Sequence, residues 1–455
     1  MKGVPTTRIV SLYLVPSFLL QLGLLLFATF KLPLDASLVV PAAGIFVSLL
    51  YAAVLYSLGS PLAIQMPHYT MVLAVIGLGI LVSGMHYGLY YALSGDFFAP
   101  DRPDTVSYHN WAIALMENDF WHGIEEYLDR GLIGELGTIL YVRMVYTIVA
   151  HPLAIGVANT VVGAITAIML FKTMVYYMPR NLALFFAGAF AASPMLLTFN
   201  SSNFKEPMLL LLVVTSYYCV ASFTHGGKLK FLILLIPLLA VLMTFRSVLS
   251  GMLVLSLLVH VVRRGTMSRP TKVVVLSLLV LLLAQLSSLV LFAIRRFSLG
   301  DVQRLMSVRE AGMEAGGNAL LAFLSSLVSQ AVGPIPRTLI TTTNKVAAFN
   351  APGLLFRYFT SLLFLLGIFE IIRNKERKLY PLLLFIVMHS TALALILRGF
   401  DLRFALPHMP LVYLVSGYFV GKRQQFLVTR ANLGLVTSFV AVALLVAVLY
   451  NIRGL

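Results

Sequence analysis

Apolar runs of about 20 residues recur along the whole chain, and they constrain its fold more than any other feature. A run of that length can cross a bilayer as a helix, because each backbone N–H and C=O then finds its partner within the same helix. The mean hydropathy of +0.93 and the charged fraction of 11% agree with this interpretation, since soluble domains carry roughly twice that charge. The sequence therefore predicts an all-α, polytopic transmembrane helical bundle, with residues 1–455 forming a single integral membrane domain.

The apolar runs predict about 13 membrane spans, within a range of roughly 11 to 14. They lie near residues 9–30, 37–57, 71–93, 151–171, 181–198, 206–224, 229–245, 247–262, 272–294, 353–372, 379–397, 404–421 and 433–450. Only Arg246 separates the two short spans of the pair 229–262. The segment 138–150 is predicted to be a re-entrant or interfacial helix. The first run is predicted to stay in the protein, because no small-residue cleavage site follows it.

The distribution of charge predicts the orientation. With a cytoplasmic N-terminus, the short basic loops fall on the cytoplasmic side, as the positive-inside rule requires. Of the 17 acids, only Glu370 and Glu376 fall on that side. The net charge of +16 would also suit nucleic-acid binding, but no basic patch with interleaved aromatic residues lies outside the apolar runs. Nucleic acid is therefore not a predicted partner.

Two long segments, 94–150 and 295–352, fall on the predicted outer side. Both show helical periodicity broken by Gly and Pro, so we expect outer loops that contain amphipathic helices lying on the membrane surface. The first loop gathers five of the acids within 30 residues, namely Asp96, Asp101, Asp104, Glu117 and Asp119. The positive-inside rule already places most cations on the cytoplasmic side, which leaves the acids on the outer side. This clustering alone is therefore weak evidence of function.

Asp104 lies in the stretch "DTVSYHNWA". It shares a predicted helix face with Tyr108 and Ala112, at i, i+4 and i+8. Pro103 suits a helix start, where a carboxylate is favoured by the macrodipole. Two interpretations stay open: a solvated carboxylate at a helix start, or a general base that takes a proton from an acceptor hydroxyl at the outer membrane surface.

Isolated cations lie at the ends of predicted spans. In "SSNFKEP", Lys205 and Glu206 precede Pro207, which is well placed to begin a helix. Neighbours in sequence do not face each other on a helix. Lys205 therefore either snorkels or binds an anionic headgroup or diphosphate near a helix N-terminus. Arg246 is either a snorkelling residue of a short outer turn or a functional residue within an apolar run.

A late loop, "RGFDLRFALPHMP", crowds charges at the same predicted face. Arg398 and Arg403 either bind phosphate, for which the guanidinium fork is suited, or pair with Asp401. His408 is either an acid or base or a buried polar contact. In the second outer loop Arg337 follows the turn "GPIP" and is the basic residue there that we single out.

The acidic first large outer loop, "SSNFKEP", the isolated arginine one hairpin later and "RGFDLRFALPHMP" together resemble polytopic bacterial glycosyltransferases of the GT-C type. They also resemble the related Wzy- and EpsG-like polysaccharide polymerases. The resemblance implies a GT-C-like fold in the bacterial inner membrane, with polysaccharide or glycoconjugate assembly as the setting. It also implies a sugar donor on a polyprenyl phosphate or diphosphate, a reaction at the outer (periplasmic) face and inversion at the anomeric centre.

The resemblance also implies residue roles. An acid of the first large outer loop is the base, which maps to Asp104 with Asp96 and Asp101 as reserves. The lipid phosphate maps to Lys205, Arg246, Arg398 and Arg403. Beside these, Glu206, Arg337 and His408 are further candidates for the phosphate site, and Tyr108 and His109 are candidates for the acceptor site. The sequence contains no HExxH motif and no Cys/His metal cluster, and a divalent cation, Mg²⁺ or Mn²⁺, stays open as a cofactor.

Three functions follow, in order. The first is a transferase that adds one sugar from a polyprenyl-linked donor. The second is a polymerase that joins lipid-linked repeat units, favoured by a departure from the GT-C pattern: three predicted spans, rather than one, precede the first large loop. The third is a flippase or transporter of lipid-linked oligosaccharide, which would line a path with charges through the membrane. The implied partners are a polyprenyl-linked sugar or oligosaccharide, the bilayer and other polysaccharide-assembly proteins.

Overall fold

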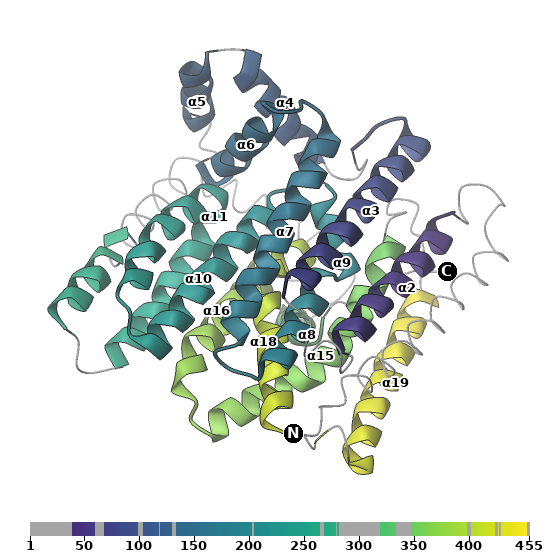
Figure 1. The fold of residues 1–455 in the computed structure, drawn as a ribbon, viewed down its shortest axis with the longest axis vertical. Coiled ribbons are helices and arrows are strands. Elements are labelled where there is room, and N and C mark those ends of the chain that lie inside the picture. The colour runs from purple at the N-terminus through teal and green to yellow at the C-terminus, as the bar shows by residue number, and fades with distance from the viewer. Residues whose placement is uncertain are drawn as a thin grey trace.

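The computed structural model is helical throughout the residues that it describes, and its helices pack into one bundle (Figure 1). The described residues are 39–59, 68–98, 103–117, 119–129, 133–202, 204–263, 268–278, 280–281, 319–333, 347–397, 402–423, 426 and 429–452. The helices are α2 (Val39–Gly59), α3 (His68–Ser94), α4 (Pro103–Glu117), α5 (Phe120–Asp129), α6 (Ile133–Tyr146), α7 (Pro152–Met174), α8 (Arg180–Ala191), α9 (Pro194–Asn200), α10 (Glu206–Gly226), α11 (Lys230–Arg263), α14 (Ala319–Val332), α15 (Ala347–Arg373), η2 (Arg377–Leu379), α16 (Tyr380–Leu397), α17 (Leu402–Ala405), η3 (Leu406–His408), α18 (Met409–Lys422) and α19 (Arg430–Ile452). The predicted all-α class is confirmed.

Several helices are long and apolar enough to cross a membrane, as expected of a multi-pass membrane protein. Within the described ranges they are Tyr69–Ala92, Pro152–Met174, Glu206–Gly226, Lys230–Val259, Arg377–Leu395 and Arg403–Lys422, which makes six by length and composition. The bent pair α8 and α9 would be a seventh. The predicted total of about 13 stays a prediction, because span 9–30 and most of 272–294 lie outside the described residues. The GT-C-like arrangement also stays a prediction.

Helix α11 is sharply bent at Arg246. This residue has extended backbone angles, φ −164° and ψ 95°, inside an otherwise helical stretch. The Ser250 hydroxyl donates a hydrogen bond of 3.1 Å to the carbonyl of Leu239, whereas eleven residues of straight helix would separate the two by about 16 Å. The halves of α11 therefore fold toward each other, and the predicted break between 229–245 and 247–262 is confirmed. Arg246 lies at the tip of the bend.

Helices α4, α5 and α6 gather at one end of the bundle, at the top of Figure 1. The inward face of α4 carries Tyr108 and Ala112, both buried, which confirms the helix face predicted from their spacing. Helix α6 approaches the α11 bend closely at Gly137, where an added Cβ would lie 2.4 Å from Thr244 Oγ1. The predicted helices of the 94–150 loop are therefore present, while their position relative to a membrane stays a prediction. Much of 295–352 lies outside the described residues.

Helices α15 and α18 pack tightly in the centre through Gly367. A Cβ at Gly367 would lie 2.6 Å from the backbone oxygen of Val415 and 2.7 Å from its Cγ1. Small residues allow such close helix approach in membrane proteins, where packing drives association. Gly367→Ala should therefore destabilise the protein by about 1–3 kcal/mol, measured as a lower melting temperature in detergent. Gly88→Ala in α3, where nothing lies within 4 Å of the added Cβ, should not, and equal effects would contradict this packing.

Candidate functional site

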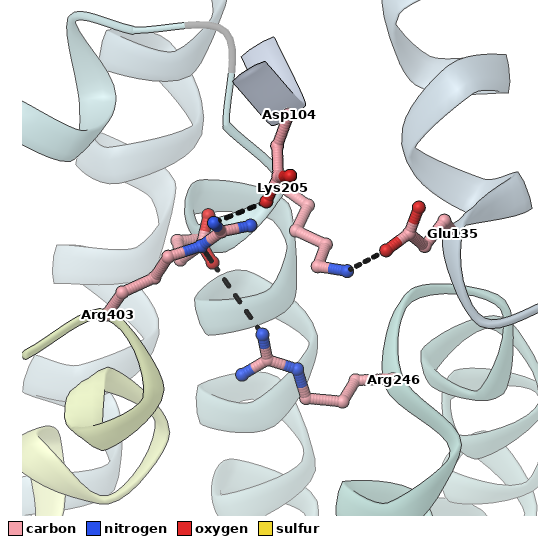
Figure 2. A network of polar contacts seen from close by, with 6 residues as sticks. Asp104, Glu135, Lys205, Arg246 and Arg403 are labelled. Atoms are coloured by element: carbon pink, nitrogen blue, oxygen red, sulfur yellow. Dashed lines mark hydrogen bonds and ion pairs between the residues drawn. The ribbon is translucent and has the colours of Figure 1, made fainter. Parts of the chain in front are cut away.

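Six charged side chains from five separate parts of the chain meet at the end of the bundle that α4 and α6 cover (Figure 2). They come from the first turns of α4 and α6, the start of α10, the α11 bend and α17. They are Asp104, Glu135, Lys205, Glu206, Arg246 and Arg403. We call this group the ion cluster. Five of the six are predicted site residues, and the prediction that they lie at the same face of the protein is consistent with this arrangement.

Arg403 bridges two carboxylates within the ion cluster. Its Nε lies 2.5 Å from Glu206 Oε1 and its Nη1 lies 2.6 Å from Asp104 Oδ2. The guanidinium also lies 5.2 Å from the centre of the Phe204 ring, and only 13% of the side chain is exposed. Such a fork fixes the direction of each partner, which a lysine cannot do. Arg403 therefore ties α17 to both α4 and α10.

Glu206 is the fully buried member of the ion cluster, with 0% of its side chain exposed. It is the first residue of α10, where the helix N-terminus favours a negative charge. Its Oε1 accepts from Arg403 and lies 3.8 Å from Arg246 Nη2. Its Oε2 has no hydrogen-bond partner among the described residues. A buried acceptor without a donor is costly, so this oxygen marks a place where a ligand group or water can donate.

Lys205 is buried rather than snorkelling, so that interpretation is wrong. Its Nζ lies 3.3 Å from Glu135 Oε1 and 5.9 Å from the centre of the Tyr108 ring. Burial lowers the pKa of the ammonium and nearby Arg246 lowers it further, while Glu135 and Glu206 act in the opposite direction. The Glu135 side chain is 40% exposed, so this carboxylate can turn toward solvent at small cost. Lys205 and Glu206, as expected, do not pair with each other.

One polar group of the ion cluster, Asp104, and one beside it, Tyr108, remain available to a ligand. Asp104 is 48% exposed, and among the described residues only its Oδ2 is engaged, by Arg403. The hydroxyl of Tyr108 is buried and has no hydrogen-bond partner within the described part of the chain. Burial, chiefly, raises the pKa of this phenol above its ordinary value, so the group stays protonated and can donate. Asp104 Oδ1 can accept a hydrogen bond. Tyr108 and Asp104 therefore present a donor and an acceptor on the same face of α4.

Counted over the described residues, the ion cluster is electrically balanced, with three cations and three carboxylates. Arg246 also packs against an aromatic ring, with its guanidinium carbon 4.7 Å from the centre of Phe404. An anionic ligand can therefore gain a cation only by replacing a carboxylate. Glu135 is the natural one to be replaced, because Glu206 is fully buried and Asp104 is held by a 2.6 Å bond. The geometry therefore suits a site where an incoming anion replaces the Glu135 carboxylate next to Lys205. The carboxylate of Asp104 can accept a hydrogen bond from a hydroxyl there.

Other predicted site residues lie elsewhere. His109 Nδ1 lies 2.7 Å from the Tyr146 hydroxyl, and Asp96 accepts a 2.6 Å bond from the Phe97 amide; neither has an ion pair with the cluster. His408 makes a buried polar contact, with its Nδ1 2.9 Å from that of His389. Asp101, Arg337 and Arg398, together with Asp401, lie outside the described residues.

Sequence reasoning missed Glu135 and Arg357. Glu135 is one acid among several in an amphipathic segment, and only its place in the first turn of α6 distinguishes it. Arg357 is fully buried and its Nη2 donates to the carbonyls of Gln330 and Ala331, at 3.2 and 2.8 Å. It thus caps the C-terminus of α14. The rule that singled out Arg246, a charge within an apolar run, would also have found Arg357.

The described residues contain no group of three or more His, Cys, Asp and Glu side chains placed to hold a metal ion. Comparison with known proteins adds no assignment to this geometry. No protein-family model matches the chain, and a search of curated proteins finds no significant relative.

Proposed function

We propose that this protein is a membrane glycosyltransferase that takes its sugar from a polyprenyl phosphate or diphosphate at the outer face of the membrane. The observation that carries the proposal is the ion cluster itself. Charges from segments up to 299 residues apart converge at one end of an apolar bundle, where isolated charges are costly. A lipid-linked substrate would present its phosphate at that level, with its chain along the apolar helices.

The chemistry that we propose is a single displacement. The oxygen of an acceptor hydroxyl attacks the anomeric carbon, and its proton passes to Asp104 Oδ1. The bond between the anomeric carbon and the phosphate oxygen breaks, and the phosphate leaves with the electron pair. Arg403 orients Asp104 through their 2.6 Å bond. Arg246 and Lys205 stabilise the growing negative charge on the leaving phosphate, and attack opposite to the phosphate inverts the anomeric centre.

Glu135 is proposed to hold, before the donor binds, the place beside Lys205 that the donor phosphate takes. It is the exposed partner of buried Lys205, so a lipid phosphate can take over the ammonium while Glu135 turns to solvent. This exchange explains how a balanced cluster can accept an anion without leaving a buried carboxylate unpaired.

Glu135→Gln should therefore strengthen donor binding, because the phosphate no longer competes with a charged carboxylate. We expect a KM for the lipid-linked donor that is about threefold to fivefold lower, with little change in kcat. Steady-state kinetics in detergent measure both. Glu117→Gln, an exposed acid of α4 without an ion pair in the cluster, is the matched control. A higher KM for Glu135→Gln than for this control would contradict the exchange.

The proposed activity is tested with purified protein and a radiolabelled polyprenyl-linked sugar. Transfer of label to a water-soluble or lipid-linked acceptor is the expected result. Reconstituted movement of the lipid-linked sugar across vesicles, with no glycosidic product formed, would overturn the proposal in favour of a flippase.

A polymerase that joins lipid-linked repeat units is the second candidate, and the central position of Arg403 favours it. One guanidinium there holds both Asp104 and Glu206, so an arginine rather than a carboxylate organises the site. Product length separates the candidates, because a polymerase yields a ladder of products whereas a transferase adds one sugar. In a polymerase, loss of Arg246 or Arg403 should reduce turnover more than loss of Asp104.

A further inference from the structure

A groove of about 1260 Å³ lies between α11, α15 and α16. Its walls are apolar and include Val259, Ile372 and Val387, which are among the exposed large apolar side chains. At one end, where the chain turns from α15 into α16, it is lined by Lys375, Arg377, Lys378 and Tyr380, and we call this end the mouth. Helix α16 begins at this mouth and ends just before α17, 18 residues later, a rise of about 27 Å. The groove mouth is therefore at the opposite end of α16 from the ion cluster.

The cations at the mouth are not neutralised by the acids beside them. Glu376 pairs with Lys422 at 3.2 Å, and Glu370 pairs with Arg423, also at 3.2 Å. Both partners belong to the end of α18. Within the described part of the chain, no ion pair joins a carboxylate to the three mouth cations, Lys375, Arg377 and Lys378, which are all exposed. The mouth of the groove therefore presents three positive charges together.

Lys375 holds a backbone conformation that favours glycine. Its φ of 53° is the only positive value among the described non-glycine residues. The turn is a helix C-terminal motif, in which the Glu376 amide donates to the Ile371 carbonyl at 3.0 Å and glycine is the usual residue at the left-handed position. A lysine adopts this conformation at an energetic cost that glycine would not have. An ammonium placed at the groove mouth supplies a reason for that cost.

We propose that this groove is a binding site for an anionic phospholipid of the surrounding membrane, such as cardiolipin or phosphatidylglycerol. The acyl chain lies along the apolar walls and the headgroup phosphate meets Lys375, Arg377 and Lys378. Basic pockets between membrane helices bind such headgroups by the same combination of charge and apolar contact. The site is independent of the proposed glycosyl transfer, so failure of one proposal leaves the other testable.

The test measures lipid binding to the purified protein in detergent by native mass spectrometry, with cardiolipin, phosphatidylcholine and polyprenyl phosphate as separate probes. Cardiolipin should bind more tightly than phosphatidylcholine. Each mouth cation removed should weaken cardiolipin binding about fivefold, and the triple variant Lys375→Gly, Arg377→Gln, Lys378→Gln about a hundredfold. Lys375→Arg, which keeps the charge, should bind as the parent does.

Lys375→Gly separates binding from folding. Glycine relieves the positive φ, so the lipid-free variant should melt no lower than the parent even though its cardiolipin affinity falls. Lys172→Gln, an exposed cation in the last turn of α7 outside the groove, is the matched control and should bind cardiolipin normally. Parental affinity in the triple variant, or equal affinity for phosphatidylcholine, would overturn the proposal. Displacement of cardiolipin by a much lower concentration of polyprenyl phosphate would also overturn it, because the occupant would then be the lipid carrier.

Discussion

Arg403→Ala is expected to abolish turnover and to lower the melting temperature of the purified protein by about 5 °C. The substitution removes the bridge between Asp104 and Glu206. It leaves Glu206 fully buried, with Arg246, 3.8 Å away, as the closest cation in the described part of the chain. A buried carboxylate that loses its partner is strongly destabilising. Turnover of a labelled lipid-linked sugar and a thermal melt in the same detergent measure the two effects.

A double variant separates the structural role of Arg403 from its chemical role. Arg403→Ala combined with Glu206→Gln removes the unpaired buried charge, so the melting temperature should recover while turnover stays absent. Arg403→Lys keeps the charge but cannot reach both carboxylates with a fork, so it should lie between the parent and Arg403→Ala in both measurements. Full turnover in Arg403→Ala would show that the ion cluster is not the reaction site.

Asp104→Asn should reduce kcat by about 10²- to 10⁴-fold, the usual contribution of a general base. Asparagine keeps the shape of the side chain and can still accept a bond from Arg403, but it cannot take the proton of the acceptor hydroxyl. Because Asp104 is 48% exposed, the melting temperature should change little. Kinetics at saturating donor and acceptor measure the effect on chemistry apart from binding.

One matched control and one test of the alternative base accompany Asp104→Asn. Glu125→Gln on α5 removes an exposed acid at the same end of the bundle and should leave kcat unchanged. Asp96→Asn tests the reserve assignment, since Asp96 is engaged with the Phe97 amide and is not ion-paired with the cluster. A loss of kcat in Asp96→Asn, together with full activity in Asp104→Asn, would move the base to Asp96.

The helical class and most element positions could be predicted, because a membrane leaves few choices to the backbone. The helix start at Pro103, the start of α10 beside Pro207 and the break at Arg246 follow from proline geometry and from a single charge in an apolar run. The bend between α8 and α9, 53° at a break near Ser193, falls inside the single predicted span 181–198 and was not predicted. Its apolar pattern continues through the bend, so hydropathy carries no sign of it.

The sequence could predict that four residues of the ion cluster lie at the same face of the protein. It could not predict which of them form ion pairs with each other. Alternating spans place Asp104, Lys205, Arg246 and Arg403 at the same side. Nothing in the sequence selects Asp104 and Glu206 as the partners of Arg403, because this choice depends on the packing of helices about 200 to 300 residues apart. The local alternative, a pair between Arg403 and Asp401, stays a prediction, because Asp401 lies outside the described residues.

The matching of three cations with three carboxylates in the ion cluster affects how a substrate arrives. A neutral group of charges produces a field that falls off steeply with distance, so the cluster exerts little pull on an anion beyond contact range. Capture of a lipid phosphate would then be governed by sideways diffusion within the bilayer rather than by electrostatic steering. The site would then distinguish one lipid from another only on direct contact, when the lipid phosphate competes with Glu135 for Lys205.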